Sequence, residues 1–211
     1  CVCIFFVNYT APPGISPLSL PAPFPFYRYL LGSVGRISPE APVPIVLLNS
    51  QNERAGGAAN VAANLALLGI KTHLIGCVGD DLEAQSLSKL IANAGIDTKG
   101  LVTSKQRPTI AKTRIVSGHQ QMMRLDQESN SAFTIEETKS VVNAIQIART
   151  TKPTVVILSD YAKGLLSVEV CQTVIAQCNA LQIPVLVDPK AHDYSQYQGT
   201  TALSTNKMVQ A

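Results

Sequence analysis

The sequence predicts an α/β protein with a mostly parallel sheet, covered on both faces by helices, and a small accessory β-sheet. Short apolar segments typical of buried strands alternate with longer helical segments, as they do in parallel sheets with crossover helices. Consecutive β segments in the middle of the chain interrupt this alternation and predict the accessory sheet. The chain has 211 residues, of which 46% are hydrophobic and 15% charged, so it is long and apolar enough to bury a core.

The first half of the chain contains strands and helices that proline and glycine delimit. Prolines limit the start of the first expected strand, and a glycine ends each of the first two helices. Aspartates that follow the second strand favour the N-terminus of the second helix. The expected elements are a strand over 43–49, a helix over 58–68 that Gly69 ends, a strand over 71–78 and a helix over 82–94 that Gly95 ends.

The second half contains the accessory segments and then the renewed alternation. The central accessory segment alternates apolar with polar residues and is expected to be half exposed. The accessory β segments cover 100–103, 109–117 and 120–126, with Gly118 at a turn. A helix over 135–149, a strand over 155–158, a helix over 168–181, a strand over 185–187 and a short strand over 201–203 follow.

Two glycines, Gly56 and Gly57, open the first helix, whose first turn carries Asn60. Glycine lets a ligand approach the backbone closely, and a helix N-terminus offers unpaired N–H groups with a partial positive charge. These residues therefore predict the floor of a site for a hydroxyl-rich or anionic small molecule. A glycine-rich helix start that serves packing alone is the alternative interpretation.

Polar residues follow three of the later strands, where a parallel sheet presents its ligand-binding edge. Asp160 and Asp188 suit sugar hydroxyls or a metal ion, whereas Lys163 and Lys190 suit phosphate oxygens; Asn206 follows the last strand. We expect these residues to line one cleft with the glycine-rich helix start. Two alternatives remain open: Asp160 as a cap of the following helix, and Asp188 as the start of a turn before a proline.

Three cations, Lys112, Arg114 and Arg124, lie in the accessory β segments. Such residues are ordinary on the solvated face of a strand. The alternative is that the accessory sheet forms a lid whose cations reach a phosphorylated substrate. The sequence is compatible with both a solvated strand face and a lid that contacts the substrate.

Composition argues against several other classes of protein. The net charge of +3, from 17 basic and 14 acidic residues, and the absence of basic clusters argue against nucleic-acid binding. The stretch Gly-Cys-Val-Gly-Asp-Asp at 76–81 lacks the spacing of a dinucleotide-binding loop, and neither cysteines nor histidines have metal-site spacing. The apolar segment over 1–7 is too short to span a membrane and no basic segment precedes it. Cys171 and Cys178 are expected about 10 Å apart on one helix, too far for a disulfide, so we expect reduced cysteines and a cytoplasmic protein.

Four stretches carry a resemblance to a known family. They are Arg-Ile-Ser-Pro-Glu-Ala-Pro-Val-Pro at 36–44, Glu-Arg-Ala-Gly-Gly-Ala-Ala-Asn at 53–60, Gln-Gln-Met-Met-Arg-Leu-Asp at 120–126, and Ser-Asp-Tyr-Ala-Lys-Gly at 159–164 followed by Asp-Pro-Lys at 188–190. Together they resemble the ribokinase-like (PfkB) sugar kinases, and within them the bacterial D-glycero-β-D-manno-heptose 7-phosphate kinases. The first and fourth stretches are specific to that branch.

The resemblance implies a three-layer sandwich with a mostly parallel central sheet and a small β-lid that often pairs two subunits. It also implies that ATP, with Mg²⁺, phosphorylates C1 of heptose 7-phosphate for lipopolysaccharide core synthesis. A sugar phosphate and a second copy of the chain, rather than nucleic acid or a membrane, would be the partners. The residues implied for the substrate are Gly56, Gly57, Asn60, Lys112, Arg124, Asp160 and Lys163, and those for the ATP side are Asp188, Lys190 and Asn206.

The chain also departs from the family pattern. The resemblance divides it into an atypical proline-rich segment at 1–26 and a partial kinase domain at 27–211. Tyr27 stands where the family has an Asp near the sugar, and Val209 where it has a Glu that helps to organise Mg²⁺.

The family's Gly-Ala-Gly-Asp, with its catalytic base, would lie beyond Ala211, so the C-terminal part of the fold is expected to be missing. We therefore expect no catalytic residue or metal ligand and little activity in this chain. A non-catalytic sugar-phosphate binder, a dimerising remnant and a kinase for another sugar remain alternatives.

Overall fold

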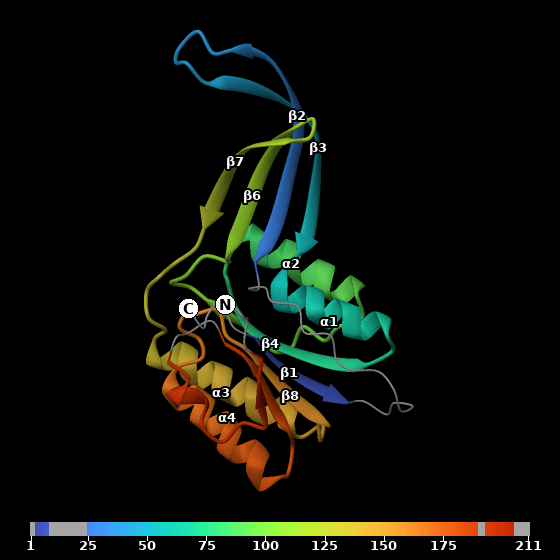
Figure 1. Ribbon diagram of the computed structural model, residues 1–211, viewed down its shortest axis with the longest axis vertical. Coiled ribbons are helices and arrows are strands. Elements are labelled where there is room, and N and C mark those ends of the chain that lie inside the picture. Colours follow the sequence, from blue (N-terminus) through green and yellow to red (C-terminus); the bar gives the residue numbers. More distant parts are fainter. Residues whose placement is uncertain (1–2, 9–24, 190–192, 205–211) are drawn as a thin grey trace.

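The computed structural model describes residues 3–8, 25–189 and 193–204, which form a layered core and a projecting sheet (Figure 1). Most of the proline-rich segment lies outside the described residues. The core contains a six-stranded sheet, and the projecting part is a four-stranded sheet that we call the lid. No helix in the described part of the chain is long and apolar enough to cross a membrane.

The core sheet is mostly parallel, as predicted. Its strands lie in the order β10-β9-β8-β1-β4-β5. β1 runs antiparallel to both of its neighbours, whereas the remaining paired strands run parallel to one another. The strands are β1 (Cys3–Asn8), β4 (Lys71–Gly79), β5 (Leu101–Ser104), β8 (Val155–Ser159), β9 (Val185–Asp188) and β10 (Ala202–Leu203).

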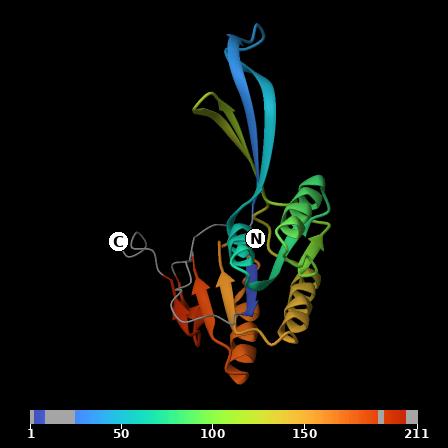
Figure 2. The ribbon, with the colours of Figure 1, turned by 90° about the vertical axis from the view of Figure 1, so that its right-hand side faces the viewer.

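Helices cover both faces of the core sheet and make three layers, which confirms the predicted sandwich (Figures 1 and 2). Successive side chains of β4 separate the two apolar clusters, because neighbouring residues of a strand point to opposite faces. Leu74 packs with α1 (Gly57–Leu67) and α2 (Leu82–Asn93), whereas Ile75 packs with α3 (Ile135–Arg149) and α4 (Val168–Ala180).

Side chains cap three of the four helices at their N-termini. Asp81 caps α2, Ser167 caps α4, and Thr134 forms a reciprocal capping box with Glu137 at the start of α3. Glu137 is only 8% exposed and also accepts a hydrogen bond from the hydroxyl of Ser104, the last residue of β5. Burial raises the pKa of Glu137, but the hydrogen bonds from Ser104 and Thr134 outweigh it and lower that pKa below its ordinary value.

The described cysteines agree with the sequence prediction that no disulfide joins Cys171 to Cys178. Both are buried on α4 with free thiols, and Cys77 on β4 is likewise buried. Burial raises the pKa of the Cys77 thiol to about 11, with the charge of Glu137 adding to the effect, so this thiol is neutral at physiological pH. These three cysteines therefore behave as small apolar residues of the core.

The lid sheet has the order β3-β2-β6-β7 and extends away from the core (Figures 1 and 2). Its central strand β2 pairs antiparallel with β3 and parallel with β6, and β7 pairs antiparallel with β6. Gly118, with φ of +59°, lies in the turn between β6 and β7, where the sequence predicted a turn. The strands are β2 (Phe26–Ile37), β3 (Pro44–Ala55), β6 (Ala111–Ser117) and β7 (Gln120–Gln127).

Two sequence expectations about this sheet were wrong, and one of its strands was not expected. The strand expected over 43–49, as the start of the α/β alternation, is the longer lid strand β3. The segment over 100–103, expected in the accessory sheet, contains most of β5, which instead pairs parallel with β4 at the edge of the core sheet. β2, the central strand of the lid, was not expected at all. A strand's own pattern does not identify its partner, which is why the grouping failed.

The register of the lid separates its side chains into two faces, because paired residues in adjacent strands point to the same side. One face, which we call the cationic face, carries Tyr27, Tyr29, Arg54, Lys112, Arg114, Arg124 and Asp126. The opposite face, which we call the apolar face, carries Leu30, Ile115, Met123 and Leu125. The accessory sheet is therefore amphipathic: Arg54, Lys112, Arg114 and Arg124 share one face, whereas Arg28 lies on the other face and pairs with Glu53 and Glu83.

Candidate substrate-binding site

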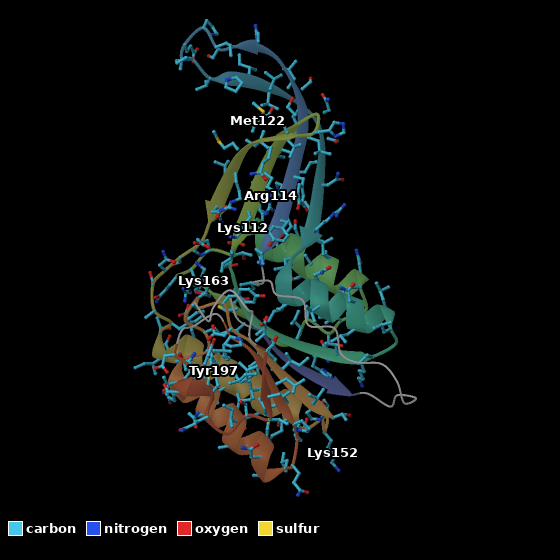
Figure 3. The ribbon with its side chains drawn as sticks, viewed as in Figure 1. Lys112, Arg114, Met122, Lys152, Lys163 and Tyr197 are labelled. Carbon is cyan, nitrogen blue, oxygen red and sulfur yellow. The ribbon has the colours of Figure 1, made fainter. Side chains whose placement is uncertain are left out.

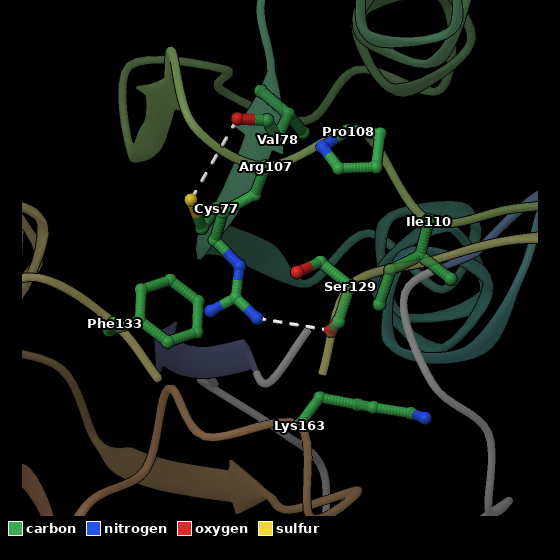
Figure 4. Close-up of a pocket in the computed structure, with 8 residues that line it drawn as sticks. All are labelled: Cys77, Val78, Arg107, Pro108, Ile110, Ser129, Phe133 and Lys163. Carbon is green, nitrogen blue, oxygen red and sulfur yellow. Dashed lines mark hydrogen bonds between the residues drawn. The ribbon is translucent and has the colours of Figure 1, made fainter. Parts of the chain in front are cut away.

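The carboxyl ends of β4, β5, β8 and β9 meet at one edge of the core sheet, where open α/β sheets bind ligands. Figure 3 shows Lys112 and Arg114 on the lid, above the edge from which Lys163 extends. A pocket lies at this edge, lined by the end of β4 and by the loops that follow β5, β7 and β8 (Figure 4). The predicted lysine of the loop after β8, Lys163, is among its lining residues.

Lys163 is partly buried and has an acidic partner. Its ammonium group donates to Oε1 of Glu128 at 3.0 Å, and the two side chains are 24% and 26% exposed. Glu128 lies in the loop after β7, so this ion pair joins the base of the lid strand to the loop after β8. The ammonium group of Lys163 is thus held at the pocket by a residue from a different loop.

Arg107, which the sequence analysis did not single out, lines the same pocket from the loop between β5 and β6. A short network holds this loop against the end of β4: Asp81 accepts hydrogen bonds from the backbone N–H of Thr109 at 2.7 Å and from its hydroxyl at 2.6 Å. The hydroxyl of Thr109 in turn accepts from the N–H of Gly79 at 2.8 Å. The only sequence signal for Arg107 was a cation beside a proline between two β segments, which does not distinguish a site from an ordinary loop.

The glycine-rich start of α1 contacts the lid. Gly57 has a φ of +54°, a left-handed conformation that favours glycine. A Cβ on Gly56 would lie 2.3 Å from the ring carbon Cε2 of Tyr27 on β2 and 2.8 Å from the carbonyl oxygen of Pro25. Asn60, in the first turn, is exposed. The close neighbour that requires glycine at position 56 is thus the Tyr27 ring, so a packing reason for this glycine exists alongside the predicted ligand contact.

The predicted lid cations lie together on the cationic face. Arg124 and Lys112 both contact Asp126, at 2.8 and 3.5 Å respectively. The guanidinium of Arg114 lies 4.8 Å from the ring centre of Tyr27, and its Nη1 is buried without a hydrogen-bond partner in the described structure. Two of these cations, Lys112 and Arg124, share one carboxylate, and Arg114 stacks on tyrosine rings, so the face keeps an excess of positive charge that suits an anionic ligand.

Asp160 follows β8, as predicted, and is 3% exposed. Its Oδ1 accepts from the N–H of Ala162 at 2.7 Å, and its Oδ2 accepts from Nε2 of Gln196 at 3.1 Å and from the hydroxyl of Tyr197. Burial and the charge of Asp160 raise the pKa of Tyr197 well above its ordinary range, so the phenol keeps its proton and donates. The substrate role predicted for Asp160 stays a prediction, and its oxygens already have internal donors.

The residues predicted for the ATP side are only partly described. Asp188 ends β9, and its carbonyl oxygen accepts from the N–H of Asp160 at 2.9 Å. Lys190 and Asn206 lie outside the described residues. Among residues 3–8, 25–189 and 193–204, no group of three or more His, Cys, Asp or Glu side chains is placed to hold a metal ion. Of the three residues predicted for the ATP side, Asp188 is thus the one whose place in the fold is described, at the carboxyl end of β9.

Comparison with known proteins identifies relatives of the same kind as the sequence resemblance. Residues 30–207 match the family described as pfkB family carbohydrate kinase. A protein named "Bifunctional protein HldE" from Methylobacillus flagellatus is 61% identical over 180 residues, which cover 85% of this chain and 37% of the relative. A protein of the same name from Magnetococcus marinus is 48% identical over 182 residues, with the same coverage. The chain therefore spans little more than a third of the length of these relatives.

Solved structures share the fold at low sequence identity. A PfkB protein from Polaromonas sp. JS666 aligns with a TM-score of 0.55 at 18% identity, over 88% of this chain and 57% of that one. A ribokinase from Arabidopsis thaliana, complexed with ribose and ATP, aligns with a TM-score of 0.54 at 16% identity, over 88% of this chain and 58% of that one. These likenesses confirm the ribokinase-like α/β fold and concern the fold alone.

Proposed function

Because this chain belongs to the pfkB family of carbohydrate kinases, we propose that it binds a sugar phosphate between the lid and the carboxyl edge of its core sheet. The observation that carries the proposal is that cations from separate segments lie at the carboxyl edge of the core sheet and on the lid above it (Figure 3). Lys163 lines the pocket at the sheet edge, and Lys112 and Arg124 belong to the cationic face of the lid. Phosphate groups are the common ligands of such clusters, since several cations together offset their charge.

The proposed reaction is the transfer of the γ-phosphoryl group of ATP to C1 of D-glycero-β-D-manno-heptose 7-phosphate, in lipopolysaccharide core synthesis. The stretches at 36–44 and 159–164 and the 61% identity to a bifunctional HldE protein support this substrate. This reaction is proposed for the whole protein, because the chain spans only 37% of the length of that relative. We also propose a reducing, cytoplasmic setting, which the free, buried thiols of Cys171 and Cys178 support.

Within this proposal the chain's residues bind and orient the substrate. Gly56, Gly57 and Asn60 hold sugar hydroxyls at the start of α1, and the lid cations neutralise the substrate phosphate. Asp188, Lys190 and Asn206 face the nucleotide. Phosphoryl transfer depends mainly on positioning the substrates and on neutralising the negative charge of the phosphates. Mg²⁺ bound to ATP would contribute to that neutralisation. We assign no protein ligand to that ion and no step to it.

A ligand-binding experiment on this chain tests the proposal. At a concentration of one hundred times its dissociation constant, heptose 7-phosphate is expected to stabilise the fold by about 2.7 kcal/mol. In a chain of this length that corresponds to a rise of roughly 5–10 °C in the melting temperature. Ribose 5-phosphate is the matched control, and a larger shift with it would favour a kinase for another sugar. No shift with either compound would contradict the proposal.

We also propose that two copies pair through the apolar face of the lid. Met123 and Leu125 on β7 are 54% and 52% exposed, and an exposed apolar face of this kind is typical of a protein interface. Sedimentation velocity is expected to show a dimer that Leu125→Glu converts to a monomer, because the new charges would meet within the interface. The matched control is Leu67→Glu on α1, since Leu67 is 83% exposed and lies outside the lid. A monomer in the unsubstituted chain would contradict the pairing.

A further inference from the structure

The side chain of Arg107 is held on three sides, but one of its nitrogen atoms has no partner. The guanidinium carbon lies 3.8 Å from the ring centre of Phe133, a stacked arrangement. Its Nη2 donates to the carbonyl oxygen of Ser129 at 3.1 Å, as Figure 4 shows, and to that of Ser131 at 2.8 Å. Its Nη1 is buried and has no hydrogen-bond partner among the residues that the structure describes.

The charge of Arg107 also lacks a carboxylate partner within the described part of the chain. The other cations of this region have one: Arg28 contacts Glu53 and Glu83, and Lys163 contacts Glu128. Arg107 is affected by the charge of Glu137, but the oxygens of Glu137 accept from Ser104 and Thr134 rather than from the guanidinium. A buried charge is costly unless it is paired, and carbonyl oxygens and an aromatic ring compensate it only in part.

The pocket that Arg107 lines also contains Lys163, which comes from a different loop. Two cations thus border one small space at the carboxyl edge of the core sheet. Cys77, which lines the space as well, adds no negative charge because burial raises the pKa of its thiol to about 11. The space is partly open to solvent and measures about 10 Å³, which suits one atom of the size of a water oxygen rather than a whole sugar.

We propose that Arg107 and Lys163 bind one oxygen of a phosphoryl group, and that Arg107 is thereby a binding residue for the phosphate of the sugar substrate. The inference rests on the proposed function and adds to it a residue and a chemical requirement. Stacking on Phe133 and the two hydrogen bonds to carbonyl oxygens already fix the plane of the Arg107 guanidinium. Little conformational entropy of this side chain is therefore lost when the phosphoryl oxygen binds. The rest of the ligand stays outside the small space, in the cleft beneath the lid.

Calorimetric titration of the 211-residue chain and of Arg107→Gln tests the inference. Four probes are used: heptose 7-phosphate, the same heptose without phosphate, inorganic phosphate and ATP. Arg107→Gln is expected to weaken the binding of heptose 7-phosphate at least about tenfold, because a charge-assisted hydrogen bond is lost. The affinity for the unphosphorylated heptose is expected to stay unchanged. Lys105→Gln is the matched control, because it removes an exposed positive charge from the same loop.

The outcomes separate this inference from the proposed function. If heptose 7-phosphate binds both chains equally, Arg107 is structural and the proposed function stands. If heptose 7-phosphate does not bind but Arg107→Gln still weakens the binding of inorganic phosphate, the pocket is a phosphate site and the proposed sugar is wrong. A weakening confined to ATP would overturn the assignment to the sugar phosphate. The absence of binding by any probe contradicts both proposals.

A second variant covers the case in which Arg107→Gln does not fold. Lys163→Gln removes the other cation of the pocket, and its side chain is more tolerant because it is 24% exposed. We expect the same selective weakening of phosphorylated probes, with an unchanged melting temperature in the absence of ligand. Equal affinities in Lys163→Gln and in the unsubstituted chain would overturn the shared pocket.

Discussion

Replacing Asp160 by alanine is expected to lower the free energy of unfolding by about 3–5 kcal/mol. The substitution removes the acceptor of three donors, among them the hydroxyl of Tyr197, which is 1% exposed and has its hydrogen bond within the core. A buried donor left without an acceptor costs about 1–3 kcal/mol, and several are left here, although such costs do not add fully. Urea unfolding followed by circular dichroism measures the effect.

Two controls determine the reason for that loss. Tyr197→Phe removes one of the three donors and is expected to cost about half as much, because the other two bonds to Asp160 remain. Asp193→Ala removes a carboxylate that also accepts from a nearby residue, Ser195, but is exposed, so a far smaller loss is expected. If Asp160→Ala leaves the urea midpoint unchanged and weakens sugar-phosphate binding, Asp160 serves the substrate, as the sequence predicted.

Gly56→Ala is expected to destabilise the fold by about 2–3 kcal/mol, because the new methyl group would overlap the ring of Tyr27 and the carbonyl of Pro25. The backbone at this position has a φ of −101°, so the strain comes from crowding rather than from the dihedral angle. Urea unfolding of Gly56→Ala with and without Tyr27→Ala measures the coupling. The loss is expected to shrink by more than half when the ring is absent, because the two closest atoms belong to it.

Gly35→Ala is the matched control for this measurement. Gly35 lies on the same strand as Tyr27, and a Cβ there would meet nothing within 4 Å, so a change of less than about 0.5 kcal/mol is expected. An unchanged loss for Gly56→Ala in the Tyr27→Ala background would exclude the ring as the cause. Normal stability combined with lost ligand binding would support the ligand-approach interpretation of Gly56.

The local structure of the core was largely predictable from the sequence because it depends on local signals. The helix over 135–149 has the bounds predicted, since Thr134 and Glu137 supply a capping box at its start. Gly69 and Gly95 follow the first two helices with a φ of +77°, the conformation that favours glycine there. Two of the three predicted polar strand ends, Ser159 of β8 and Asp188 of β9, are paired at the ends of parallel strands.

The partnerships of segments distant in sequence were not predictable in this way. β2 contains Gly32 and Gly35, which weaken its alternation, and its position at the centre of the lid depends on β6. Arg107 became a candidate only because Ser129, Ser131 and Phe133 approach it from another loop. The internal bonds of Asp160 depend on Gln196 and Tyr197, more than thirty positions away. Periodicity contains no information about such tertiary contacts.

The central place of β2 in the lid has a consequence for the newly made chain. Phe26 pairs with Ala111, 85 positions later, and the whole first half of the core lies between them. During synthesis β2 and β3 can pair early, but the second edge of β2 stays open until β6 has left the ribosome. Closing so long a loop is slow, and an open strand edge is a template for pairing with other chains. The strand that supports the cationic face is therefore also the segment most exposed to misassembly during folding.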